Sequence, residues 1–235
     1  MSYDLKPSLF RHPTIVDPKS ANGLEADLLQ RYRERSIPYQ VSPWNRDRDH
    51  EWEALFIMQH FGVPTRLLDW TESPFIGLFF ALTSASLDFK TDLAAEDACV
   101  WILRPSAWNK MALSDISYPG GVLSIDKAGP LQSYAPSADF DYMRLKPVAM
   151  NGLHNSPRIV AQKGAFTIFG KSTESMESHV SDRGSTSVLQ RIIIPAARVG
   201  PLRRDLARMG ITDSVVYPDL EGLARELKRH YGFPV

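Results

Sequence analysis

The feature that most constrains this chain is a polar segment set between a strand pattern and an apolar helix pattern, residues 59–82 (QHFGVPTRLLDWTESPFIGLFFAL). Gly62 and Pro64 end the pattern before them, because glycine commonly closes a helix and proline cannot continue one. Residues 65–69 then alternate as a short strand does. Residues 74–82 are apolar nearly all round, which predicts a buried helix. Polar residues held on rigid supports of this kind are typical of a binding site.

The alternation assigns side chains to two opposite faces of the predicted strand. One face would carry Thr65, Leu67 and Asp69, and the other would carry Arg66, Leu68 and Trp70. Either Thr71 or Ser73 can cap the following helix, whose first position would be Pro74. The polar residues therefore lie at the ends of regular elements, which hold them in place.

Length and charge narrow the classes of protein to which the chain can belong. Its 235 residues are enough for one large domain or two small ones. Lys and Arg together number 27, as do Asp and Glu, and this balance argues against a broad nucleic-acid or membrane surface. The single cysteine, Cys99, excludes an internal disulfide and is typical of a reducing compartment. Since no apolar run reaches the roughly 18 residues of a membrane span, we expect a cytoplasmic protein.

Helical periodicity and end signals predict four helices outside the segment just described. They cover residues 24–35, 50–61, 202–208 and 220–231. Asn22 and Gly23 would form a turn before the first helix, and Asp47 or Asp49 would cap the second. Residues 37–45 lack periodicity and predict a loop.

Apolar and β-branched runs predict the strands. They cover residues 98–103, 189–194 and 214–217, while residues 158–161 and 165–169 would form two short strands or one strand broken at Lys163. The first of these runs is continuously apolar, so we expect a central strand there. Residues 106–155 show a poor pattern, which predicts a long functional or mobile connection. Helices fall mostly early and strands mostly late, which favours an α+β fold over an alternating parallel one.

Signatures of other chemistries are incomplete. Gly170, Lys171 and Ser172 are similar to the end of a phosphate-binding loop, but five residues instead of four separate them from Gly164. The six histidines are scattered, which gives little support for a metal site. Cys99 lies within an apolar strand pattern and is interpreted as a core thiol.

The segment of residues 59–71 (QHFGVPTRLLDWT), with the following Phe79, Phe80 and Ala81, resembles the FRG domain family. Three further blocks resemble this family, at residues 5–11 (LKPSLFR), 158–166 (RIVAQKGAF) and 217–224 (YPDLEGLA). The resemblance therefore spans nearly the whole chain, with residues 105–155 covered least.

The family is named for an N-terminal Phe/Tyr-Arg-Gly triplet, which this sequence lacks. By comparison with the family, the triplet would lie upstream of Tyr3. Phe10 and Arg11 do not represent it, because their neighbours match a downstream block.

This resemblance implies a similarity to ADP-ribosyltransferases, which split NAD at its nicotinamide–ribose bond. It implies an α+β fold over residues 1–235, with N-terminal helices, a split, mostly antiparallel sheet and an NAD cleft between its halves. NAD or a related nucleotide would be the substrate, no metal is expected, and a protein or nucleic acid would accept ADP-ribose. The family's bacterial and phage members are interpreted as toxins or defence effectors, which implies an antitoxin or partner subunit.

The resemblance and the chemistry of the bond together suggest site residues. Cleavage of the bond develops positive charge on the ribose, which a carboxylate or an oriented carbonyl stabilises. The catalytic candidates are Asp69, Gln162 and Asp219, with Gln162 standing where the transferases carry a glutamate. The cofactor-binding candidates are His60, Thr65, Arg66, Trp70 and Thr71.

Several candidates also have a structural interpretation. Arg66 could hold phosphate, or it could form an ion pair with Asp69 or Glu221. Trp70 could stack on a ring or pack in the core. Thr71 could bind a ribose hydroxyl or cap a helix.

Two functions are compatible with these residues. The first is NAD hydrolysis or ADP-ribosyl transfer, in which case Arg66→Ala and Asp69→Asn would abolish activity in a folded protein. The second is a non-catalytic module that binds a nucleotide or a partner protein, which the absent triplet and the neutral Gln162 favour. His60 would act as a catalytic base in the first, or would interact with a helix end in either.

Overall fold

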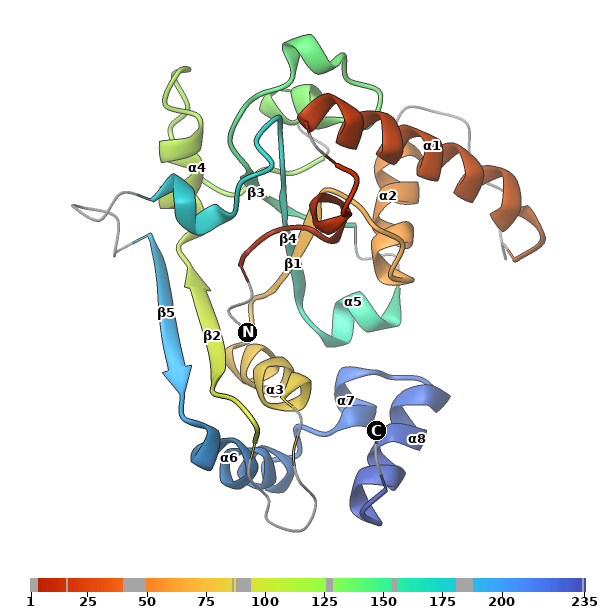
Figure 1. The fold of residues 1–235 in the computed structure, drawn as a ribbon, viewed down its shortest axis with the longest axis vertical. Coiled ribbons are helices and arrows are strands. Elements are labelled where there is room, and N and C mark those ends of the chain that lie inside the picture. The colour runs from red at the N-terminus through yellow and green to blue at the C-terminus, as the bar shows by residue number, and fades with distance from the viewer. Residues whose placement is uncertain are drawn as a thin grey trace.

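The computed structural model describes residues 4–15, 17–39, 50–85, 94–125, 129–153, 156–180 and 188–233, together with Leu87 and Val235. Within these residues, helices surround two small antiparallel sheets (Figure 1). The predicted α+β class and split antiparallel sheet are therefore confirmed. In the part of the chain that the structure describes, none of the helices combines the length and hydrophobicity of a membrane span.

The larger sheet has the strand order β1 (Leu67–Thr71), β4 (Gly164–Ile168), β3 (Val148–Asn151). Both pairings are antiparallel, with Leu67 opposite Ile168 in the first. One face of this sheet packs against α2 (His50–His60) to form an apolar core. The ring centroids of Phe56 and Phe166 lie 4.8 Å apart in that core. The larger sheet and α2 therefore share one core and form one packed unit, which holds β1 in place.

The smaller sheet pairs β2 (Ala98–Leu103) with β5 (Leu189–Ile194) in antiparallel register. Both strands have the bounds that their apolar runs predicted. The expected central position of β2 is wrong, because β5 is its one partner strand within the described residues. The continuous apolar run is explained by packing of Ala98 and Val100 against the helical layer that includes Ile76 and Phe79.

The other helices lie around and between the sheets (Figure 1). They are α1 (Pro18–Ser36), α3 (Pro74–Ser84), α4 (Pro105–Ala112), α5 (Pro157–Ala161), α6 (Ala196–Arg208), α7 (Asp213–Val216) and α8 (Leu220–His230). Short 3-10 helices are found at Ser8–Arg11, Ile37–Tyr39, Pro130–Tyr134, Phe140–Tyr142 and Met176–His179. α2, α3 and α8 begin where the sequence predicted. The proposed caps Asp47 and Asp49 lie outside the described residues.

α1 begins at Pro18 rather than at residue 24. The Asp17 carboxylate accepts a hydrogen bond of 2.9 Å from the Ser20 backbone N–H, which caps the helix, and Pro18 occupies its first turn. Asn22 and Gly23, predicted to form a turn, therefore lie inside the helix. A strong cap outweighs two poor helix formers when the remaining residues favour the helix.

Two segments predicted as strands are the short helices α5 and α7. Ser156 Oγ accepts a hydrogen bond of 3.2 Å from the Ile159 N–H, and Pro157 occupies the first turn of α5. In α7, Asp213 lies in the first turn, where an acidic residue is favoured. Because both runs are four or five residues long, periodicity could not distinguish a helix from a strand.

Residues 106–155, predicted as a long functional or mobile connection, contribute to α4 and contain β3. The buried Asn109 side chain exchanges two hydrogen bonds with the Ala149 backbone, of 2.7 and 2.8 Å. Trp108 Nε1 donates a hydrogen bond of 2.8 Å to the Pro147 carbonyl oxygen. The described part of this segment is therefore fixed to the edge of the larger sheet.

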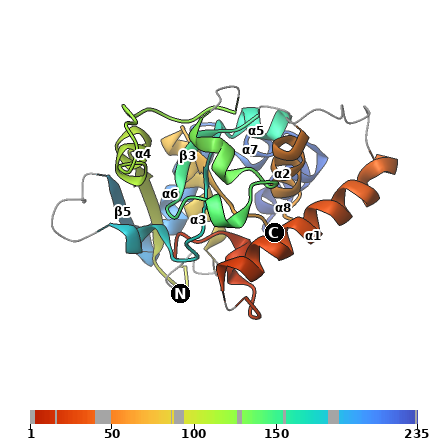
Figure 2. The same cartoon turned by 90° about the horizontal axis from the view of Figure 1, so that it is seen from above.

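Several chain segments come together beyond the end of α2. Gly62 closes α2 with φ of +75°, a conformation that glycine adopts without strain, and the chain then turns into β1. α5 lies between α2 and the α7–α8 pair (Figure 1). Seen from above, α1 runs along one side of the molecule, with α4 and β5 at the opposite end (Figure 2). The fold thus places the ends of α2, α5 and α8 in one region.

Candidate functional site

Arg66 is a buried structural residue immediately before β1. Its side chain is 1% exposed, and its Nε lies 2.6 Å from Oε2 of Glu25 in α1, which is 2% exposed. The two terminal nitrogens donate hydrogen bonds to the carbonyl oxygens of Phe169 and Tyr134, at 3.0 and 3.1 Å. Each guanidinium nitrogen therefore has a partner within the protein. The structural interpretation of Arg66 is observed, but with Glu25 in place of the two carboxylates that the sequence suggested.

A chain of hydrogen bonds connects Thr65 to Asp69 through Gln59. Thr65 is fully buried, and its Oγ1 donates to Gln59 Oε1 at 2.5 Å. Gln59 Nε2 in turn donates to Asp69 Oδ2 at 2.9 Å. Because the amide of Gln59 is held at both ends, it fixes the orientation of the Asp69 carboxyl. Thr65 therefore serves the site indirectly in this structure.

Thr71 and Gln162 connect β1 to α5 and α7. Thr71 Oγ1 donates a hydrogen bond of 2.7 Å to the Gln162 carbonyl oxygen, and Gln162 Nε2 donates one of 3.2 Å to the Val216 carbonyl oxygen. Trp70 is half-buried, and its Nε1 donates to Thr167 Oγ1 at 3.2 Å. These predicted site residues use their polar groups to fix neighbouring elements relative to one another.

Asp69 differs from these residues, because solvent reaches its side chain. It lies opposite Phe166 of β4, on the face of the sheet that carries Leu67 and the apolar core. Desolvation by the surrounding protein raises the pKa of the Asp69 carboxyl above its ordinary value, whereas the Gln59 hydrogen bond and the charge of Arg158 lower it. The Asp69 carboxyl is therefore accessible to solvent and yet partly desolvated by the protein around it.

His60, Arg158 and Asp219 share the surroundings of Asp69. Arg158, in the first turn of α5, acts electrostatically on both Asp69 and His60. Burial, and then Arg158, lower the pKa of the His60 imidazole, while Asp219 raises it. Ser156 Oγ lies 3.4 Å from His60 Nδ1. The imidazole is therefore mainly neutral near pH 7 and can accept a proton.

Tyr217 connects this cluster to α8. The guanidinium carbons of Arg158 and Arg225 lie 4.5 and 4.8 Å from the centroid of the Tyr217 ring. Gly222 packs so closely that a Cβ there would meet the Tyr217 carbonyl oxygen at 1.9 Å. Asp219 caps α8, since its Oδ1 accepts a hydrogen bond of 2.7 Å from the Gly222 N–H. Tyr217 therefore helps to position Arg158, and Asp219 has a structural role in addition to its candidate catalytic one.

Arg158 is the member of the cluster that sequence analysis did not select as a site residue. It lies in a run that was predicted as a strand, and the strand pattern did not indicate to which side the Arg158 side chain would point. The sequence did contain a signal, because Ser156 and Pro157 form a typical helix start and place Arg158 in the first turn. The resulting cluster combines a carboxyl, a guanidinium and a neutral imidazole, which can bind a phosphorylated sugar and transfer a proton. Within the described residues, no group of three His, Cys, Asp or Glu is arranged to hold a metal ion.

The first 89 residues contain α1, α2, β1 and α3, and with them the buried Arg66–Glu25 pair and the exposed Asp69. Residues 1–89 match the FRG domain family. The resemblance carried by residues 59–71 is thereby confirmed. The blocks at residues 158–166 and 217–224 lie beyond the matched stretch and stay predictions. No curated protein and no solved structure matches the chain.

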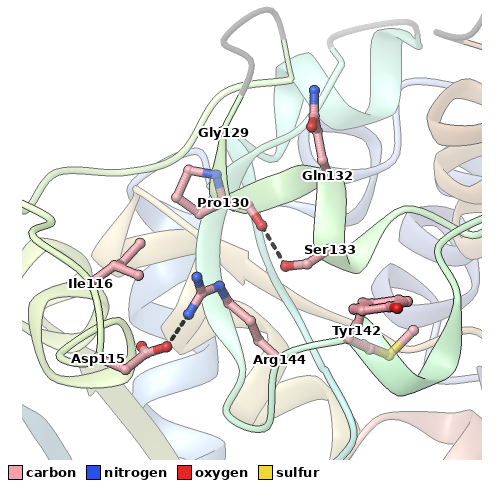
Figure 3. A pocket seen from close by; sticks show the side chains of 9 residues that line it. Asp115, Ile116, Gly129, Pro130, Gln132, Ser133, Tyr142 and Arg144 are labelled. Atoms are coloured by element: carbon pink, nitrogen blue, oxygen red, sulfur yellow. Dashed lines mark hydrogen bonds and ion pairs between the residues drawn. The ribbon is translucent and has the colours of Figure 1, made fainter.

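A cavity of about 630 Å³ lies away from the Asp69 cluster, between the end of α4 and the 3-10 helix Pro130–Tyr134 (Figure 3). Arg144 projects into its centre and pairs with Asp115, while Tyr142, 82% exposed, lies at its rim. None of the predicted site residues lines this cavity, and its lining lies outside the stretch that matches the FRG domain. The cavity therefore gives no support to the predicted site, and the candidate site remains the cluster around Asp69.

Proposed function

We propose that this protein with an FRG domain binds NAD and cleaves its nicotinamide–ribose bond, by hydrolysis or by ADP-ribosyl transfer. The observation that carries the proposal is Asp69, an accessible carboxyl oriented by Gln59 and lying within the field of Arg158. A carboxylate stabilises the positive charge that develops on ribose, and an arginine suits a pyrophosphate. The cluster offers both groups on regular elements that restrict their movement.

The reaction requires one bond to break and one to form. The bond between ribose C1′ and the nicotinamide nitrogen breaks, and its electron pair neutralises the positive charge of the leaving group. Asp69 stabilises the positive charge left on the ribose. Water, or a nucleophile of a protein or nucleic acid, then bonds to C1′ and loses a proton. The neutral imidazole of His60 accepts that proton.

Arg158 takes the phosphate-binding role that the sequence suggested for Arg66. Arg66 is buried with its nitrogens paired, whereas Arg158 is half-buried and acts electrostatically on the accessible Asp69. Asp219 supports proton transfer, because its charge favours the protonated form of His60. The proposal thus keeps Asp69, Asp219 and His60 as site residues and adds Arg158.

The proposal is tested by measuring, by chromatography, how fast the wild-type and Asp69→Asn proteins release nicotinamide from NAD. Loss of the carboxylate charge should lower the rate by about 10²-fold or more, as removal of one group that stabilises transition-state charge commonly does. Asn keeps the shape of the side chain and an acceptor for Gln59, so the fold should persist. Asp205→Asn is the matched control, because it alters an exposed carboxylate of α6 and should leave the rate unchanged. Equal rates for folded Asp69→Asn and wild type would exclude the proposed role.

The fate of ADP-ribose separates hydrolysis from transfer. With NAD that is radiolabelled in its adenine, hydrolysis yields free labelled ADP-ribose. Transfer instead leaves the label bound to a protein or nucleic acid. A toxic role for either reaction predicts growth arrest in cells that express the wild-type chain, and normal growth with Asp69→Asn.

A second function, nucleotide binding without catalysis, is favoured by one observation. Thr65, Arg66, Thr71 and Gln162 use their polar groups in hydrogen bonds within the protein. A ligand therefore meets fewer side chains than the sequence suggested. A rise in melting temperature with NAD, without nicotinamide release, would select the binding function. Absence of both would reject NAD as the ligand.

A further inference from the structure

The face of α8 that is turned away from the rest of the protein is apolar. Leu220, Leu223, Leu227 and Tyr231 recur at intervals of three and four residues, which aligns them on one side of a helix. Their exposed fractions are 84%, 44%, 50% and 71%. The opposite side of the helix packs on the protein, since Gly222 is buried. An ordered apolar row of this kind on a surface helix indicates an interaction surface.

Charged residues border this apolar face unequally along its length. Asp219 and Glu221 lie at the N-terminal end of α8, and Lys228 and His230 lie at its C-terminal end. At 3.6 residues per turn, Glu221 and Lys228 fall on one border of the face, about two turns apart. Asp219 and His230 fall on the other border, about three turns apart. The border that carries Glu221 and Lys228 is therefore acidic at one end and basic at the other, and the second border carries Asp219 at its acidic end.

We propose that this face is the interface of a homodimer, in which α8 packs antiparallel on α8 of a second copy about a two-fold axis. The acidic end of each helix then faces the basic end of the other, and Glu221, which pairs with Arg225 of its own helix at 2.6 Å, also lies opposite Lys228 of the second copy. Such an interface is symmetric, so this ion pair forms twice. The midpoint between Glu221 and Lys228 nearly coincides with that between Leu223 and Leu227. Apolar contacts and charge pairs therefore select the same register.

The alternative arrangement of two copies is excluded by charge. In a parallel pair the opposite borders of the two faces meet, so that Glu221 would lie near Asp219, and Lys228 near His230, of the second copy; acidic ends would then face acidic ends, which is destabilising. The antiparallel arrangement resembles an antiparallel coiled coil, in which charged residues at the borders set the orientation of the helices. The pattern of charge on α8 thus favours a second copy as the occupant.

The expected association is weak. α8 has 11 residues, so it is about 16 Å long. An interface centred on one helix of this length falls among those that bury less than about 1,200 Å², which are typical of transient complexes. We therefore expect a dissociation constant in the micromolar range, and ionic strength should weaken the charge pairs.

Sedimentation equilibrium of the full chain measures this association directly. The wild type should populate a dimer at tens of micromolar, and Leu227→Asp should be monomeric, because it places two charges at the centre of the apolar contact. Leu145→Asp is the matched control, since Leu145 is 58% exposed elsewhere on the surface and should not affect association. Circular dichroism should show that both variants keep their helical content.

Charge exchange tests the antiparallel register. Glu221→Lys and Lys228→Glu should each weaken self-association at least severalfold, because each homodimer then contains like charges at both positions. An equimolar mixture of the two variants should associate at least as well as the wild type, because the mixed dimer regains both opposite-charge pairs. Failure of the mixture to associate would overturn the register.

Two results would overturn the homodimer itself. One is a wild type that remains monomeric at several hundred micromolar. The other is a wild type whose association is unaffected by Leu227→Asp. If the monomeric wild type instead sedimented with vesicles of anionic phospholipid, and Leu227→Asp abolished this, the face would be assigned to a membrane surface and the homodimer rejected.

Discussion

Two polar residues of the same chain segment, Arg66 and Asp69, differ in burial and in how their polar groups are paired. Arg66 is buried, and its guanidinium nitrogens are occupied by Glu25 and by carbonyl oxygens. Asp69 is reached by solvent, has a hydrogen bond from Gln59, and has a raised pKa because the protein around it displaces water. The first position stabilises the fold, and the second leaves a carboxyl group incompletely solvated.

This difference teaches how to separate scaffold from site within one sequence motif. A buried ionic group whose partners are all present lowers the free energy of the folded state relative to any version that lacks one partner. A desolvated carboxyl that remains accessible lowers the stability of the folded protein. A ligand with complementary charge can offset this loss of stability. Both kinds of residue occur in the stretch that matches the FRG domain, so membership of the motif does not by itself assign a role.

Arg66→Ala should have the largest effect on stability. It leaves Glu25 buried and unpaired, which should lower the free energy of unfolding by about 3–5 kcal/mol. Urea denaturation followed by circular dichroism measures this. Arg208→Ala, which removes an exposed ion pair with Asp205, should cost less than about 1 kcal/mol. A stable Arg66→Ala protein that no longer binds NAD would instead restore the phosphate-binding role suggested by the sequence.

Gln162→Ala should have a smaller effect, on stability rather than on chemistry. Loss of the hydrogen bond to the Val216 carbonyl oxygen should cost about 1 kcal/mol, measured by the same denaturation experiment. Gln190→Ala, on the exposed side of β5, serves as the control. A large fall in kcat with unchanged stability would show that the Gln162 amide acts in catalysis.

Asp69→Asn should have the smallest effect on stability, and its sign depends on pH. Because the folded-state pKa of Asp69 lies above its ordinary value of 3.8, the folded protein binds this proton more tightly than the unfolded chain does. Ionisation of Asp69 therefore destabilises the wild type at pH values above the folded pKa. Asp69→Asn should be slightly more stable than the wild type near neutral pH, and the difference should disappear as the pH falls towards 3.8. Denaturation midpoints across this range measure it, and a difference that grows on acidification would contradict the raised pKa.

Elements with complete local signals were predictable from the sequence. α2 ends at a glycine with positive φ, α3 has a proline in its first turn, and β2 and β5 are continuous apolar runs. α5 and α7 were not predicted, because their β-branched residues favour strands, although Ser156 and Pro157 form a helix start at α5. The early start of α1 was not predicted, because Asn22 and Gly23 favour a turn, although Asp17 caps the helix before them.

The site was less predictable, because its decisive contacts join residues that are distant in sequence. Arg66 was expected to have a carboxylate partner, but Glu25 lies in a helix 41 residues away, and no local pattern connects the two. The electrostatic effect of Arg158 on Asp69 likewise depends on how α5 packs against β4, the strand that pairs with β1. The segment that contains the site could be identified from its residue types and from the glycine and proline residues that end its elements. Which of its side chains support the fold, and which are available to a ligand, required the three-dimensional structure.

The central claim is that the exposed cluster around Asp69, rather than the buried Arg66, receives NAD. Titration calorimetry of NAD with the wild-type, Arg158→Gln and Arg208→Gln proteins tests it most directly. Loss of a charge-assisted contact to phosphate should weaken binding about 10- to 100-fold in Arg158→Gln. Arg208→Gln, which alters an exposed arginine of α6, should bind NAD as the wild type does. Equal affinity of folded Arg158→Gln and wild type, or no binding of NAD by the wild type, would contradict the account.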